Sequence, residues 1–128
     1  SSSIILFIFW PNIMEFLNHE INTKPWGMFE LFVKNKSCSI KILYLNRNQC
    51  TSLQYHNYRN EFWKILKGKV EVVYGKQKLI LKEGDIFFIQ KRRKHRIIAK
   101  MNSEILEISF GYYDEDDVKR LEDKYGRV

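Results

Sequence analysis

From residue 28 onward, apolar residues alternate with polar ones or form short runs, and turn residues interrupt them about every eight to twelve positions. A period of two is typical of β-strands, whereas a helix repeats every three to four residues. The pattern predicts about eight short antiparallel strands, at 28–33, 39–46, 61–66, 70–74, 77–81, 86–90, 95–99 and 104–112. Strands of this length joined by tight turns are typical of a β-sandwich or a small barrel.

The C-terminal segment has a different pattern. Residues 114–117 read DEDD, which provides an N-cap and further acidic side chains where a helix dipole favours them. Val118, Leu121 and Tyr125 follow on one helical face, and Gly126 is a frequent C-terminal stop. The pattern predicts a short C-terminal helix, and we interpret the acidic run as helix capping and not as a metal site.

The N-terminal segment contains a run of seven apolar residues at 4–10, which ends at Pro11. A membrane-spanning helix needs about twenty such residues, and the features of a secretory signal are missing. Met14 begins a segment that resembles an ordinary protein start. Residues 1–13 are therefore interpreted either as artificial or translated upstream sequence, or as the source of an extra edge strand or dimer contact. We expect an N-terminal extension at 1–22 and a single domain at 23–128.

Length and composition limit the class of protein. A chain of 128 residues has room for one domain with a real core, and 45% hydrophobic residues exclude a disordered chain. A chain of this size with only two cysteines is typical of a reduced, cytoplasmic protein. The cysteines form no CxxC motif, so nothing suggests a zinc finger. The net charge is +7, and five of the six positions at 91–96 are cationic. Such a run suits a phosphate, a phosphosugar or nucleic acid, or it is a solvated turn. Because no groove-reading motif appears, we expect no nucleic-acid partner, and because the apolar run at 4–10 is too short to span a membrane, we expect no membrane partner.

Four polar residues form a candidate metal site. Gln54 and His56 are two positions apart, so on a strand they point to the same side, and Glu61 begins the next strand. His95 begins a later strand, and in a barrel all four side chains can converge. One amide oxygen, two imidazoles and a carboxylate suit Zn, Mn, Fe, Co or Ni. Taken singly, each residue has an ordinary structural interpretation, and their joint spacing is what favours a metal.

The spacing from Gln54 to Gly68 fits [HQ]-x-H-x4-E-x6-G, and the spacing from Gly84 to His95 fits G-x10-H. Together these two motifs resemble the two-part cupin signature, with glutamine in place of the first histidine. More specifically, residues 23–127 resemble the C-terminal cupin domain of type II phosphomannose isomerases, often fused behind a mannose-1-phosphate guanylyltransferase. The segments that carry the resemblance are KPWG at 24–27, SLQYHNYRNEFW at 52–63, KHR at 94–96 and EDDVKRLEDKYGR at 115–127.

This resemblance implies an all-β cupin barrel (a double-stranded β-helix or jelly roll) that dimerises and holds a divalent metal, with zinc expected first. It implies metal-assisted interconversion of mannose 6-phosphate and fructose 6-phosphate in GDP-mannose and polysaccharide biosynthesis. For the phosphate we expect Arg96 first and Arg59 second, with Lys94 beside them, because arginine offers phosphate a two-pronged donor. The sequence does not identify the general base.

Six positions differ from the family pattern. The family has histidine where this chain has Asn57, Tyr58 and Phe62. It has proline and glycine where this chain has Gln90 and Arg92, and arginine where this chain has Lys24. These differences keep two alternatives open. One is a non-catalytic, metal-containing cupin that binds a sugar phosphate or nucleotide sugar. The other is a nucleotide-sugar epimerase or ketoisomerase, because one fold supports many reactions.

Overall fold

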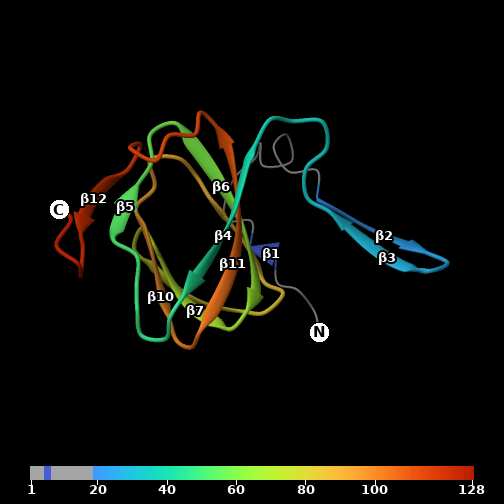
Figure 1. Cartoon of the computed structure of the whole chain (residues 1–128), viewed down its shortest axis with the longest axis horizontal. Coiled ribbons are helices and arrows are strands. Elements are labelled where there is room, and N and C mark those ends of the chain that lie inside the picture. The colour runs from blue at the N-terminus through green and yellow to red at the C-terminus, as the bar shows by residue number, and fades with distance from the viewer. Residues whose placement is uncertain (1–4, 7–18) are drawn as a thin grey trace. The chain divides into compact units, whose positions relative to one another are not determined.

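The computed structural model describes residues 5–6 and 19–128, and Figure 1 shows their strands. The chain forms two compact units, which are described separately here. The larger unit contains residues 38–128 together with strand β1 (Ile5–Leu6). The smaller unit contains a hairpin of β2 (Glu20–Lys24) and β3 (Gly27–Leu31), which pair antiparallel. The KPWG segment forms the turn of this hairpin, and Trp26 at the turn is 72% exposed.

Two five-stranded sheets make up the larger unit. The first sheet has the order β1, β9 (Ile86–Ile89), β6 (Arg59–Lys67), β11 (Ser103–Gly111) and β4 (Ser39–Leu45). The second has the order β12 (Lys119–Glu122), β5 (Leu53–Tyr55), β10 (His95–Ala99), β7 (Lys69–Tyr74) and β8 (Gln77–Lys82). All neighbours pair antiparallel except β1 and β9, which pair in parallel.

The inner faces of the two sheets pack against each other. The Trp63 ring of β6 lies 5.8 Å from the His95 ring of β10, and the Phe87 ring of β9 lies 5.3 Å from the Tyr74 ring of β7. Alternation along β10 is regular, with His95, Ile97 and Ala99 buried and the residues between them partly exposed. This period of two is the physical reason that the sequence pattern predicted strands. The prediction of an all-β fold is confirmed.

The predicted C-terminal helix is wrong, since the structure has no helix within 19–128 and forms strand β12 there instead. Strand β12 pairs antiparallel with β5, with Arg120 opposite Gln54. The acidic run also has a different role from helix capping, because the Asp117 carboxylate accepts hydrogen bonds from the backbone of Asn57 and Tyr58. Hydrogen bonds to a distant segment outweigh the local helical pattern, since propensity is a weak preference that tertiary contacts override.

The glycine that ends the first motif is required by a close approach of two chain segments. Gly68 joins β6 to β7 at φ +92°, and a Cβ there would overlap Ser103 Oγ and lie 2.5 Å from the Asn102 carbonyl oxygen. Gly75 also has a positive φ, +59°, but a Cβ there meets nothing within 4 Å.

We therefore expect Gly68→Ala to lower the free energy of unfolding by roughly 2–4 kcal/mol, because it adds a backbone clash to the strain of a left-handed residue. Gly75→Ala is the matched control, with only the left-handed strain, about 1 kcal/mol. Urea denaturation of both variants measures the difference. Equal losses would show that the approach to Asn102 does not constrain Gly68.

Candidate metal centre

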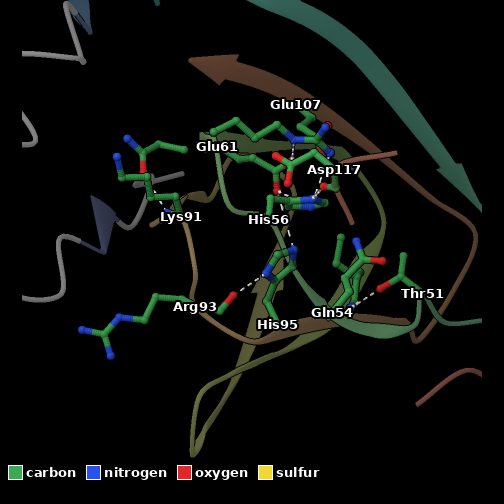
Figure 2. A network of polar contacts seen from close by, with 12 residues as sticks. Thr51, Gln54, His56, Glu61, Lys91, Arg93, His95, Glu107 and Asp117 are labelled. Atoms are coloured by element: carbon green, nitrogen blue, oxygen red, sulfur yellow. Dashed lines mark hydrogen bonds and ion pairs between the residues drawn. The ribbon is translucent and has the colours of Figure 1, made fainter. Parts of the chain in front are cut away.

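Three buried side chains from separate parts of the barrel meet at one point in the interior, as Figure 2 shows. His56 follows β5, Glu61 lies on β6 and His95 begins β10. Their ligand atoms all lie within 4.8 Å of one another. Glu61 Oε1 is 3.7 Å from His56 Nε2 and 3.6 Å from His95 Nε2. The structure therefore brings together three of the four residues that the sequence predicted as metal ligands.

Main-chain carbonyls orient both imidazoles. His56 Nδ1 donates to the Asp117 carbonyl at 2.6 Å, and His95 Nδ1 donates to the Arg93 carbonyl at 2.9 Å. Because a carbonyl can only accept, each Nδ1 carries the proton. Burial lowers the pKa of His56 to about 4 and also lowers the pKa of His95, so both rings are neutral at pH 7. Each ring thus directs an unprotonated Nε2 towards Glu61, which is how metal-binding histidines are held.

The Glu61 carboxylate is the strongest sign that a cation belongs here. It is 1% exposed, and neither of its oxygens receives a well-formed hydrogen bond from the described residues, although the side chains of Arg59 and Glu107 lie close enough to lower its pKa. Burial raises its pKa, and the Arg59 guanidinium, whose Nε is 3.4 Å from Oε2, opposes that rise. A buried carboxylate without well-formed hydrogen bonds is costly, and two imidazole lone pairs face it. This donor set fits a divalent metal ion.

The fourth predicted ligand, Gln54, lies beside the cluster. It is the register partner of His95 across β5 and β10. Its Oε1 accepts a hydrogen bond from Ser52 Oγ at 2.6 Å, so this oxygen already has a partner. Gln54 as a ligand therefore stays a prediction.

A cavity of about 680 Å³ reaches the cluster at His56, whereas Glu61 and His95 do not line it. His56 and Gln54 line it on one side, and Lys41, Glu107 and Arg59 also contribute to its wall. The cavity therefore gives a small ligand direct access to His56.

Glu107 is a site residue that the sequence interpretation missed. It lies on β11 opposite Trp63, is 4% exposed, and has its Oε2 3.4 Å from Lys41 Nζ. Burial, together with the negative charge of Glu61, raises the pKa of Glu107 to about 8. One signal could have revealed it: Glu107 lies between the inward-facing residues Ile105 and Ser109 of its strand. A carboxylate at a buried position lowers stability unless it is paired, so such a residue is a candidate for a functional role.

Arg59 is the predicted phosphate cation that the structure brings to the site. It is 4% exposed, lines the cavity, and places its guanidinium 4.6 Å above the Tyr113 ring. One terminal nitrogen donates to the Asp114 carbonyl at 3.3 Å, and the other lies 3.4 Å from His56 Nε2. Arg59 therefore contacts the cluster of His56, Glu61 and His95, lines the cavity, and bonds the segment before β12.

Arg96 and Lys94 are not brought to the cavity wall. Arg96 follows His95 on β10, so strand alternation turns it to the opposite face, where it bonds the Thr51 carbonyl at 3.1 Å and Glu122 at 3.3 Å. Lys94 is exposed and lies in the loop between β9 and β10. Although Lys94 and Arg96 are adjacent to His95 in sequence, neither side chain lies beside the three candidate ligands.

The loop that carries Lys94 contributes main-chain atoms to the site and exposes its charged side chains. The Arg92 amide donates to the His56 carbonyl at 2.6 Å, and the Lys91 amide donates to Asn60 Oδ1 at 2.7 Å. Residues 91–94 are all exposed, so the side chains of the basic run are solvated. Its backbone is hydrogen-bonded to the segment that contains His56 and Asn60.

The arrangement of strands is that of a cupin. A cupin superfamily protein from Desulfitobacterium hafniense matches with a TM-score of 0.56 at 17% identity, over 63% of this chain and 73% of that chain. A likeness at this level of identity concerns the fold alone. It confirms the predicted cupin barrel.

The sequence identifies the family more closely. The pattern of the family described as "Mannose-6-phosphate isomerase C-terminal" matches residues 12–123. The chain is 33% identical over 108 residues to the xanthan biosynthesis protein XanB of Xanthomonas campestris pv. campestris, covering 82% of this chain and 23% of that protein. It is 30% identical over 116 residues to the mannose-1-phosphate guanylyltransferase of Klebsiella pneumoniae, covering 88% and 25%.

This chain belongs to the mannose-6-phosphate isomerase C-terminal family. It spans about a quarter of the length of the curated relatives it matches. Across the part of the chain that the structure describes, no helix is long and apolar enough to cross a membrane.

Proposed function

We propose that this chain is a metal-dependent isomerase domain that interconverts mannose 6-phosphate and fructose 6-phosphate in the synthesis of GDP-mannose for polysaccharides. One observation carries the proposal: two imidazole Nε2 atoms face a buried carboxylate whose oxygens lack a well-formed hydrogen bond, beside a cavity of about 680 Å³ to which Lys41, Arg59 and Arg127 contribute. Family membership supplies the substrate class, since the matching family is described by this isomerase.

His56, Glu61 and His95 would hold the metal. Two histidines and a glutamate are a known ligand set of catalytic zinc, so zinc is our first choice, and Mn, Fe, Co and Ni also accept these donors. When bound, the metal polarises the sugar carbonyl and orients its hydroxyl groups. Because both histidines are neutral and fixed through Nδ1, neither needs to lose a proton or rotate before it binds.

The reaction moves protons between two neighbouring carbons. One proton leaves C2 of the aldose, another arrives at C1, and the hydroxyl proton passes from O2 to O1. A base must lie within reach of the carbon-bound proton. Glu107 is the carboxyl group that lines the cavity and adjoins Glu61 without belonging to the three candidate ligands, so we assign proton transfer to Glu107 and phosphate binding to Arg59. The nearby Lys41 lies 3.4 Å from Glu107 and holds its carboxylate in place.

A second candidate is a non-catalytic cupin that binds a sugar phosphate. It is favoured by the environment of Tyr58, which stands where the family has histidine: its ring is 61% exposed and contacts Tyr112 instead of the metal cluster. Phe62, at another histidine position of the family, is fully buried. Two imidazoles of the family pattern therefore have no counterpart in this cavity.

A coupled isomerase assay decides between the two candidates. We expect turnover of mannose 6-phosphate by the metal-loaded protein, its loss after chelation and its return when zinc is added. Glu107→Gln should retain metal and lose most turnover, because the amide can neither accept nor return the proton. Since only the ionised form of Glu107 accepts a proton and its pKa is about 8, wild-type turnover should rise as the pH increases from 7 through 8. A protein that binds metal and mannose 6-phosphate but shows no turnover would instead support the non-catalytic candidate.

A further inference from the structure

We propose that Asp117 is a positioning residue for the metal centre, because it holds His56 in the orientation that a metal requires. The inference rests on the proposed metal site and concerns how that site is built. Asp117 belongs to the acidic run before β12, sixty-one positions after His56 in sequence. It does not touch the ligand atoms and would act only through His56 and the two residues that follow it.

Three hydrogen bonds join Asp117 to three consecutive residues of the ligand motif. Its Oδ1 accepts from the Asn57 amide at 2.9 Å, and its Oδ2 accepts from the Tyr58 amide at 3.0 Å. Its main-chain carbonyl accepts from His56 Nδ1 at 2.6 Å. The residue is 9% exposed, so these bonds are largely shielded from water. One residue therefore fixes both the backbone of this loop and the imidazole ring that the loop carries.

The loop needs such support because the sheet does not provide it. Strand β5 ends at Tyr55 and β6 begins at Arg59, so residues 56–58 lie between two strands and lack their own ladder of hydrogen bonds. The Arg92 amide holds the His56 carbonyl, but it does not contact the ring. On its Nδ1 side the ring is oriented by the Asp117 carbonyl, and on its Nε2 side Arg59 lies 3.4 Å away; the two carboxylate bonds keep the Asp117 carbonyl at a fixed distance from the loop.

Neighbouring contacts of the same segment extend this support. The Asp114 carbonyl accepts a hydrogen bond from Arg59, and the Tyr113 ring lies beneath the Arg59 guanidinium. Coupling between two sites is reciprocal. If Asp117 stabilises the metal-binding orientation of His56, a bound metal must in turn stabilise the contact between Asp117 and residues 56–58.

Asp117→Asn is the decisive variant, with Asp116→Asn as its matched control. The side-chain nitrogen that this change introduces cannot accept from a backbone amide, so one of the two carboxylate bonds is lost. Asp116 is exposed and adjacent, with the same charge change. Loss of a group that orients a metal ligand typically costs 10–100-fold in metal affinity. We expect Asp117→Asn to weaken zinc binding by that factor in competition with a chromophoric chelator, and Asp116→Asn to leave it within about twofold.

Two readouts separate positioning from a general loss of stability, and neither uses isomerase activity. Nitrogen-15 NMR of the metal-free protein should show both His56 and His95 protonated at Nδ1, and Asp117→Asn should disturb His56 alone. Zinc should slow amide exchange at Asn57 and Tyr58 in the wild type, and less so in the variant.

Wild-type zinc affinity in Asp117→Asn, with an unchanged His56 signal, would overturn the positioning role and leave the isomerase proposal intact. Conversely, weakened zinc binding in that variant together with an inactive wild-type protein would support the positioning role and reject the isomerase.

Discussion

Replacing His95 with alanine is expected to remove most of the bound metal from the protein. The loss should exceed about 100-fold in affinity, because loss of an orienting partner alone costs 10–100-fold and this change removes a ligand. His56→Ala should have the same effect, since both Nε2 atoms face the same oxygen of Glu61. Metal content after dialysis, measured by elemental analysis, gives the result.

The His95 change also leaves a space beside Trp63, so its effect on folding must be measured separately. His95→Asn keeps much of the volume and serves as the second variant. His19→Ala is the matched control, because His19 lies in the β2–β3 unit and bonds Glu30 there. If folded His56→Ala and His95→Asn proteins both retained stoichiometric metal, these residues would not be the ligands.

The second large effect concerns the phosphate group of the substrate. Arg59→Ala is expected to weaken binding of mannose 6-phosphate by roughly 10–100-fold while changing the affinity for mannose much less, because a charge-assisted bond contributes about 1.5–3 kcal/mol. Arg96→Ala should leave both affinities unchanged, since Arg96 lies on the opposite face of β10 and bonds Thr51 and Glu122. Calorimetric titration of the two sugars measures the difference.

Arg59 also contacts Glu61, so metal content must be checked in each variant. Arg59→Lys provides the control, because it keeps the charge and loses the two-pronged geometry. Added salt should weaken binding of the phosphosugar and not of mannose. If Arg96→Ala lost the preference for the phosphosugar and Arg59→Ala kept it, Arg96 would be the phosphate-binding residue, as the sequence first indicated. Equal wild-type affinities for the two sugars would reject the phosphosugar.

The strands and the clustering of three candidate ligands could be predicted from sequence for the same physical reason. Alternation with a period of two reveals that Glu61 and His95 face the interior from strands of the two facing sheets, and His56 follows directly after β5, the neighbour of the strand that carries His95. The same rule, applied to Arg96, places it outside the barrel, although its adjacency to His95 had favoured it as the phosphate cation.

The parts that sequence did not reveal depend on contacts between distant segments. The acceptors for the two imidazoles are main-chain carbonyls of Arg93 and Asp117, and every residue type offers such a carbonyl. The acidic run has a helical pattern locally, and only its bonds to Asn57 and Tyr58 show why β12 forms instead. Side-chain identity carries little information about these contacts.

In the loop between β9 and β10, the surface charge and the orientation of the two histidines depend on different atoms, the side chains and the backbone. Its backbone fixes the His56 carbonyl and the His95 ring, whereas the side chains of residues 91–94 extend into solvent. The electrostatic potential of this end of the barrel can therefore vary widely during evolution, or be redesigned, while the coordination geometry inside stays the same. If the proposed function holds, the loop's side chains would set the long-range attraction of an anionic substrate, and its backbone would set the geometry at the metal, so the two quantities could be adjusted independently.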